Sequence, residues 1–325
     1  MKIIYKLLFL FLLTIGYSSC DFLDIVPDEI TTEADAFKDR NAAKNFVYSC
    51  YGYLPQSNVA SGSLDLLTGD EVITAFEHET FASFPKGNYT ASSPVISYWN
   101  TFFQGLRQCY IFLENVDKVP DLTESVKTDY IAQVKFLIAY YHYQLARCYG
   151  PIILIKELPD VNASQAEYLP RTSYDECVDW ICNLLDEAAS SLPAIRTNKE
   201  DYGLATSVGA KAVKAKMLLY AASPLFNGNS SFYSNFTDKS GSQLMPLTYD
   251  PNKWVKAKTA IKEAIDLAEQ NGHALYVKQD YKIGNEDANP YPAAGPVRCL
   301  RTSLVDWDSR NPEVLLAETR SEGSY

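Results

Sequence analysis

The stretch SYWNTFFQGLRQCYIFLENVDKVPDLTESVKTDYIAQVKFLIAYYHYQLARCYGP, residues 97–151, decides the fold. Apolar residues recur every three to four positions on both sides of Pro120, which is the period of an amphipathic helix. The pattern predicts helices over 97–119 and 124–149. Gly150 and Pro151 end the second helix, because glycine tolerates a left-handed cap and proline cannot continue a helix. The short link between the two helices predicts an antiparallel hairpin.

The same periodicity continues on both sides of this hairpin. It predicts four more helices, over 40–54, 173–192, 206–222 and 251–271. Asp39 is a predicted N-cap of the first, and Ser173 with Glu176 forms a predicted capping box. Asp250 followed by Pro251 is typical of a helix start. We therefore expect helices paired into hairpins.

The predicted fold is all-α, built from helical hairpins of tetratricopeptide size with long loop insertions. Alanines along 206–222 permit close approach of a neighbouring helix. The two long loop regions, 56–94 and 273–312, are expected to fold over the helices, and loops of this length usually carry function. We expect the hairpin 97–149 to be the most buried part of the chain.

The N-terminus predicts export rather than structure. Lys2 and Lys6 precede a short apolar run at 7–15, and small residues then lead to Cys20. This is a secretory signal over residues 1–20, too short to span a bilayer core of about 30 Å. Small residues before a cysteine are typical of a lipobox, so Cys20 is the predicted lipidation site. The alternative is an ordinary signal cleaved nearby.

Composition excludes several classes of function. The net charge of −11 and pI of about 4.8 argue against nucleic acid as a partner. The six cysteines after Cys20 form no C-x-x-C pair and there are three histidines, so we expect no metal site and no cofactor. Cys50, Cys109 and Cys148 are interpreted as buried small apolar residues. Export leaves disulfides possible without indicating their pairing.

Several segments resemble one family, the SusD/RagB outer-membrane nutrient-binding lipoproteins, in the same order along the chain. They are Cys20–Asp24 with Pro27, Thr31–Phe37, Tyr51-Gly52, Asp70-Glu71, Trp99 with Tyr110 and Leu113–Asn115, Ala139–Pro151, Arg171–Glu176 and Asn311–Val314. The resemblance implies tetratricopeptide-like hairpins arranged as an alpha-alpha superhelix over 21–325. Family members usually run well past this length, so we expect the C-terminal portion to be missing.

The resemblance also implies a function. It indicates a surface-exposed lipoprotein of the cell outer membrane that captures oligosaccharides. Its implied partner is a SusC-like TonB-dependent transporter, to which it delivers the sugar. Which glycan or other nutrient is bound is not encoded in these motifs.

Candidate ligand residues lie in the two long loops, because sugar recognition combines aromatic ring faces with polar groups for hydroxyls. The first loop contributes Phe76, His78 and Tyr89; the second contributes Tyr291, Asp306, Trp307 and Asp308. Trp307 stands between two aspartates, so its ring would stack while the carboxylates bind hydroxyls. Trp99, Trp180 and Trp254 are interpreted as packing residues.

Two other classes of function stay open. A glycoside hydrolase would need two carboxyls about 5–10 Å apart, for which Asp70 with Glu71, or Asp306 with Asp308, are the candidates. No G-x-S-x-G, H-E-x-x-H or phosphate-binding loop is present. A helical scaffold that binds only protein is the third class. The loop aromatics favour a glycan-binding protein that is not an enzyme.

Replacing Cys20 by alanine should abolish lipid attachment, because the signal is too short to anchor the chain by spanning. Detergent partitioning and metabolic acyl labelling would check this. Asp21 follows the cysteine, which in enterobacteria would mean retention at the inner membrane, whereas the resemblance implies export to the surface. Protease shaving of intact cells should therefore degrade the wild-type protein; protection would contradict the surface assignment.

Overall fold

The computed structural model describes residues 33–55, 80–160, 162, 164, 169–277, 295–303 and 311–319. Within these ranges the regular structure is helical, with isolated β-bridges at Thr90–Ser93 and Thr237–Gln243 and no strand. The helices are α2 Glu33–Ala36, α3 Arg40–Tyr51, α4 Trp99–Asn115, α5 Glu124–Tyr149, α6 Tyr174–Ser191, α7 Ser207–Ala222, α8 Ser230–Tyr233, α9 Asn252–Gln270 and α10 Pro296–Ser303. The prediction of an all-α fold is confirmed.

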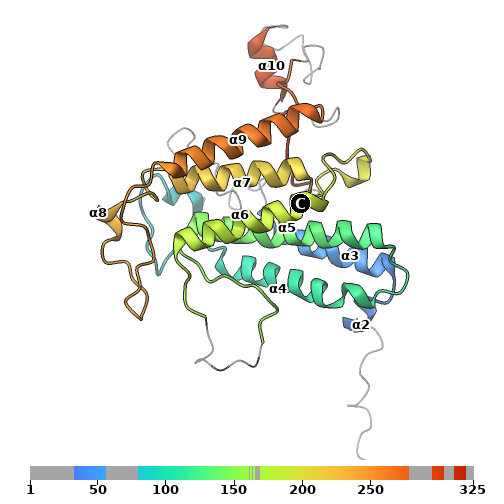
Figure 1. Cartoon of the computed structure of the whole chain (residues 1–325), viewed down its shortest axis with the longest axis horizontal. Helices are drawn as coiled ribbons and strands as arrows, with labels where there is room; N and C mark the ends of the chain where they lie inside the picture. Colours follow the sequence, from blue (N-terminus) through green and yellow to red (C-terminus); the bar gives the residue numbers. More distant parts are fainter. Residues whose placement is uncertain are drawn as a thin grey trace, which may run out of the picture.

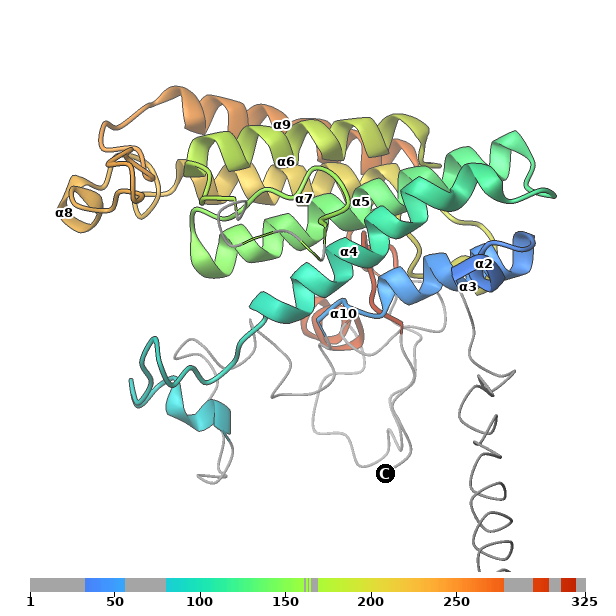
Figure 2. The same cartoon turned by 90° about the horizontal axis from the view of Figure 1, so that it is seen from below.

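Helices α4, α5, α6, α7 and α9 lie side by side, each antiparallel to its neighbour (Figure 1). Helix α3 packs on α4 and α5, below the main layer (Figure 2). The short link at 116–123, which contains a 3-10 turn, forms the predicted hairpin between α4 and α5. The arrangement is an array of helical hairpins, as expected. Among the helices described, none combines the length and apolar character needed to cross a bilayer.

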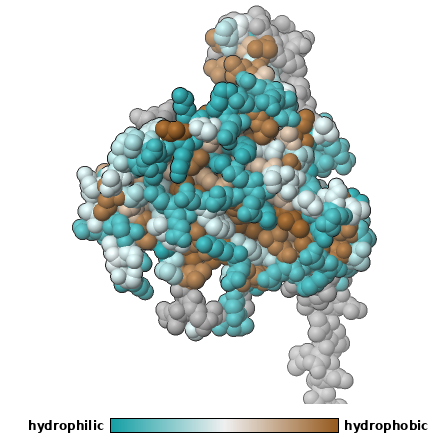
Figure 3. Space-filling model, viewed as in Figure 1, coloured by the Kyte–Doolittle hydropathy of each residue, from teal (hydrophilic) through white to brown (hydrophobic). Residues whose placement is uncertain are grey.

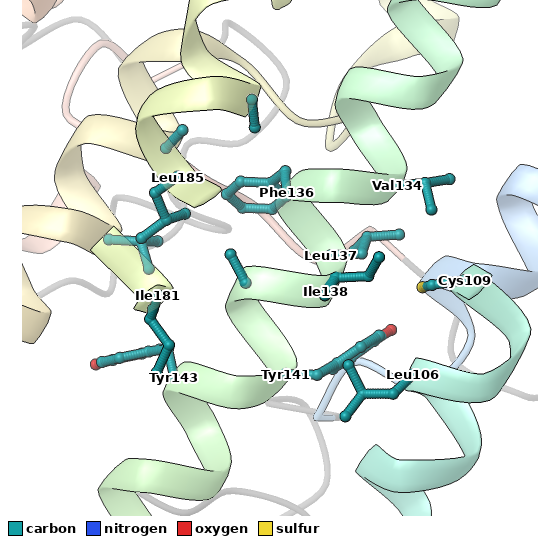
Figure 4. Packing of buried hydrophobic residues seen from close by; sticks show 14 of the residues in the cluster. Leu106, Cys109, Val134, Phe136, Leu137, Ile138, Tyr141, Tyr143, Ile181 and Leu185 are labelled. Carbon is teal, nitrogen blue, oxygen red and sulfur yellow. The ribbon is translucent and has the colours of Figure 1, made fainter. Parts of the chain in front are cut away.

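Helix α5 lies at the centre of the core. Its side chains at Val134, Leu137, Ile138, Tyr141 and Leu145 are almost completely buried. Figure 4 shows Tyr141 and Leu137 directed toward Leu106 and Cys109 of α4, while Phe136 and Tyr143 face Ile181 and Leu185 of α6. Because α5 is covered on both sides, its apolar residues surround the helix rather than forming one stripe. The expectation that 97–149 is deeply buried is confirmed for α5.

The contact between α7 and α9 is made largely by alanine. Ala215 of α7 is buried in a cluster with Ala260 and Ala264 of α9. Side chains of one carbon let two helices approach closely, as the alanine content of 206–222 predicts.

Most helix ends lie within one to three residues of their predicted positions, but not always for the predicted reason. The Asp39 side chain accepts a hydrogen bond from Ala42 N–H, and Gly150 ends α5 at φ +70°. Ser173, however, makes no capping bond. The capping-box prediction is therefore wrong. The first N–H of the helix, that of Tyr174, donates to Leu244 O at 2.8 Å.

Two of the packing predictions need correction, those for Cys148 and Trp254. Cys148 is exposed rather than buried, whereas Cys50 and Cys109 are buried as expected. Trp254 is 41% exposed on the outer side of α9, where no described helix covers it. Trp180 packs against the core as predicted.

A buried polar network joins three parts of the chain. Tyr51 Oη of α3 accepts from Ala205 N–H and donates to Gln133 Oε1 of α5, at 2.9 and 3.0 Å. Gln133 Nε2 donates to Asp129. Arg196, in the α6–α7 connection, donates to both Asp129 oxygens at 2.7 and 3.0 Å and to Ala205 O. Paired charges with satisfied hydrogen bonds fix the relative positions of these elements.

A second polar contact holds the chain after α5. The His142 ring is fully buried, with Nδ1 2.8 Å from Ile138 O and Nε2 accepting from Ile155 N–H at 3.1 Å. This geometry assigns the neutral tautomer with hydrogen on Nδ1. Burial lowers the pKa of His142 to about 4. The imidazole therefore attaches residues 152–155 to α5 only while it is uncharged.

We predict that acid destabilises the protein through His142. The unfolded chain binds a proton at a pKa near 6.5, whereas the folded ring resists protonation down to pH about 4. Stability is thus complete above about pH 6.5 and falls by about 2–3 kcal/mol as the pH drops to about 4. Urea unfolding of wild type and His142→Gln at several pH values would measure this. Parallel pH profiles for the two proteins would contradict the assignment.

Candidate functional site

The structure describes one of the predicted ligand residues, Tyr89. Phe76, His78, Tyr291, Asp306, Trp307 and Asp308 lie outside the described residues, as do Cys20 and the carboxyl pair Asp70 and Glu71. Tyr89 is 51% exposed, so the ring has a free surface as sugar stacking requires.

A tight turn positions the Tyr89 ring. After the 3-10 turn Thr80–Ser83, Gly87 adopts φ +62°, which favours glycine, and Asn88 N–H donates to Ser83 O at 3.0 Å. The Tyr89 ring then meets the Phe84 ring edge-on, with centroids 5.4 Å apart. One side of the tyrosine is supported by this contact while half of the ring stays accessible.

The loop that carries Tyr89 enters the bundle at a cluster of Trp99, Tyr149 and Arg171. The Trp99 and Tyr149 rings are nearly perpendicular at 5.2 Å, and the Arg171 guanidinium lies 5.3 Å from the Trp99 ring centroid. Arg171 donates to Tyr149 O and Pro151 O, and Tyr149 Oη accepts from Tyr98 N–H. These bonds hold the start of α4 against the end of α5. Sequence spacing could not reveal this cluster, because its members come from three distant segments.

Three loops emerge at the same end of the helical array. Residues 80–98, the connection after α5, and the segment with α8 between α7 and α9 all lie there (Figures 1 and 2). Phe232 and Tyr249 in the third loop are 76% and 57% exposed. Their exposure was not predicted; the only signal is their place among serines and asparagines. We call this end of the bundle, defined by residues 80–98, 150–160, 169–173 and 223–251, the loop end.

The helical face outside the loop end is mainly polar. Figure 3 shows hydrophilic side chains over much of this face, with smaller apolar patches between them. Within the described residues, no group of three or more histidine, cysteine or acidic side chains is arranged to hold a metal ion. Asp186 is a charged residue with a structural role. Burial alone would raise the pKa of its carboxyl, but ion pairs with Lys211 and Lys214 lower it.

A cleft of about 240 Å³ opens at the other end of the bundle. It is lined by Ile195, Arg196, Tyr202–Leu204, Thr206, Asn271–His273, Asn311, Pro312 and Val314–Ala317. Its polar groups serve the fold: Arg196 binds Asp129, and His273 Nδ1 lies 2.9 Å from Pro312 O. A Cβ on Gly203 would lie 2.7 Å from Thr319, so glycine there admits the segment 311–319. The segment 311–319 thus forms one wall of the cleft.

Comparison with known proteins finds SusD-like relatives. Residues 21–219 match the sequence profile of a SusD-like family described as "Starch-binding associating with outer membrane". A curated relative, SusD-like protein P25 of Formosa agariphila, is 23% identical over 230 residues, covering 67% of this chain and 43% of the relative.

Solved structures are also similar. The structure of BT4246 shares 35% identity at a TM-score of 0.69, over 75% of this chain and 42% of that one. A SusD-like protein from Bacteroides fragilis, BF3747, shares the fold at 22% identity and a TM-score of 0.53, over 77% and 42% of the two chains. The chain thus spans about two fifths of the length of these relatives.

Replacing Tyr89 by alanine should change stability by less than about 0.5 kcal/mol, because half of the ring is exposed. Trp99→Ala, the matched change at the cluster below, should cost about 2–3 kcal/mol, because it removes packing against Tyr149 and Arg171. Urea unfolding monitored by circular dichroism would compare the two. An equal loss in both variants would identify Tyr89 as a packing residue.

Proposed function

We propose that this chain, which belongs to the SusD-like family, captures oligosaccharides at the outer membrane surface and passes them to a SusC-like TonB-dependent transporter. The observation that carries the proposal is the match of residues 21–219 to a family described as starch-binding and associated with the outer membrane. The helical array and its 35% identity to BT4246 support the same assignment. Lipidation at Cys20 would hold the protein at the membrane.

The proposed ligand surface combines Tyr89 at the loop end with candidate residues of the two long loops that lie outside the described residues. Tyr89 supplies a ring that is accessible to solvent and supported by Phe84. Phe76, His78, Tyr291 and Trp307 would add further ring faces, and Asp306 and Asp308 would accept hydrogen bonds from sugar hydroxyls. A single exposed ring contributes little binding free energy, because the contact buries little area and the sugar hydroxyls only exchange hydrogen bonds with water for hydrogen bonds with protein. Several rings along one glycan would raise the affinity by summation.

The proposed activity is binding without cleavage. Inverting or retaining hydrolysis needs a carboxylic acid whose pKa is raised, beside a second carboxylate. Among the described carboxyls with a shifted pKa, Asp186 and Asp238 are both shifted down, by ion pairs and by hydrogen bonds. Such groups stay ionised and suit structural roles. The candidate pairs Asp70 with Glu71 and Asp306 with Asp308 are left to experiment.

We predict that the chain from Asp21 onward binds oligosaccharides weakly, with Kd near or above about 0.1 mM. Tyr89→Ala and Trp307→Ala should each weaken binding several-fold. Tyr48→Ala is the matched control, since Tyr48 is a partly exposed ring on α3, outside the loop end. Calorimetry against a panel of neutral oligosaccharides would measure this. Binding that falls equally in all three variants, or no binding at all, would contradict the site.

Two outcomes would redirect the assignment. If Trp307→Ala unfolds the protein by several kcal/mol, as truncation of a buried aromatic does, Trp307 is a core residue and the site moves to Phe76, His78 and Tyr89. If prolonged incubation releases shorter sugars, and Glu71→Gln or Asp306→Asn stops the release, the protein is a hydrolase.

A further inference from the structure

Helices α3 and α4 cross as an antiparallel pair with a regular sequence of contacts. Phe46 stacks on Phe112 with centroids 6.2 Å apart. Two turns along, Gly105 of α4 lies against Tyr53, two residues beyond the end of α3; a Cβ on this glycine would be 2.9 Å from Tyr53 Cβ. The absent side chain lets the two backbones approach closely. These two contacts determine which residues of α3 and α4 face each other in the stretch that lies between the contacts.

Cys50 and Cys109 are the residues that meet between these contacts. Both are completely buried, and the Cys50 thiol is near enough to Cys109 to help raise the pKa of the Cys109 thiol. Figure 4 shows the Cys109 sulfur directed toward α3. Two buried cysteines that face each other between these contacts are the pair from which an S–S bond of about 2.05 Å can form.

The other cysteines of the structured region are placed differently. Cys177 Sγ donates to the backbone oxygens of Ile152 and Thr172 instead of another thiol. Cys148 is exposed, Cys299 is half-buried on α10, and Cys182 is buried on α6, where Lys214 and Asp186 rather than another thiol act on its sulfur. The contact between Cys50 and Cys109 therefore selects a pairing that spacing along the chain leaves undetermined.

We propose that Cys50 and Cys109 form a disulfide in the exported protein. Each thiol gives up its hydrogen, the two sulfurs bond, and two electrons and two protons pass to a disulfide oxidant, which leaves as two thiols. Compartments beyond the inner membrane supply such oxidants. The proposal takes only this export from the proposed function; the pairing itself rests on the α3–α4 contact.

The timing of the reaction follows from burial. The apolar surroundings and the adjacent Cys50 raise the pKa of the Cys109 thiol, and only thiolates attack disulfides. The fully packed interface is therefore slow to oxidise or reduce, and the bond should form while α3 and α4 are coming together, before their contact is closed to solvent. Once formed, it closes the base of the loop that carries Phe76, His78 and Tyr89.

Peptide mapping of the wild-type chain tests the pairing. The reduced, denatured chain is refolded with glutathione and glutathione disulfide, quenched in acid, unfolded and alkylated. We expect one linked peptide joining Cys50 to Cys109, with Cys148, Cys177, Cys182 and Cys299 alkylated. Alkylation of both Cys50 and Cys109 before reduction, or their linkage to other cysteines, overturns the proposal.

A second arm examines exported protein taken from cells after thiol trapping. A Cys50–Cys109 link there supports the full proposal. A link that forms on refolding but not in cells overturns disulfide formation in the exported protein while leaving the pairing and glycan binding intact. Because mapping uses the wild-type sequence, no variant has to fold for these tests.

Thermal unfolding supplies an independent readout. Reductant should lower the Tm of oxidised wild type by roughly 5–10 °C, because the closed loop restricts the unfolded chain. This shift should disappear in Cys50→Ala/Cys109→Ala and persist in the matched control Cys148→Ala/Cys299→Ala. If the reductant still lowers the Tm of Cys50→Ala/Cys109→Ala, the redox effect comes from other cysteines and the proposal is wrong.

Discussion

Burial of α5 on both long faces is the constraint on which the rest of the structure depends. A helix without a solvent face must find protein partners for its polar side chains, because an unpaired buried polar group costs about 1–3 kcal/mol. Tyr141 Oη donates to Cys50 O of α3, Gln133 bonds Tyr51 and Asp129, and His142 binds the backbone at Ile155. The bonds of Tyr141 and Gln133 join α5 to the end of α3, the bond of His142 joins it to the segment that follows, and the bond between Gln133 and Asp129 lies within α5. The polar groups of α5 therefore determine which segment lies against which part of the helix.

The same arrangement explains why the loops gather at one end. Antiparallel neighbours with short links on one side must make their longer connections on the other. The links 116–123 and 192–206 lie at one end, and the segments before α4, after α5 and after α7 lie at the loop end (Figure 1). Arg171 and His142 attach the connection after α5 to the helices that it leaves. The helices thus form a rigid frame that positions Tyr89 but is not itself part of the ligand surface.

The helices were predicted well because their bounds depend on residues that are close together in the sequence. Apolar periodicity with proline and glycine at the ends placed α5 at its observed bounds and α4 to within two residues at its start. Contacts made by distant residues were not predictable. Leu244 O accepts from the first N–H of α6, and Trp99 meets Arg171 across 72 positions of sequence. Tyr89 could be proposed from its residue type and loop, whereas its support by Phe84 required the folded turn.

Affinity for a glycan depends on how little the binding surface must be ordered when the sugar arrives. Stacking on one ring is a small gain, so the cost of immobilising side chains and loops decides whether several rings add up to useful binding. Phe84 already supports one edge of Tyr89, and Arg171 and Tyr149 already fix Trp99 at the foot of the loop. A covalent link between Cys50 and Cys109 would constrain the same loop from its base, where α3 leads into it and α4 leads out. If the loop is already ordered from both sides before the sugar binds, less binding free energy is lost in immobilising it. Each ring contact then contributes more to the affinity.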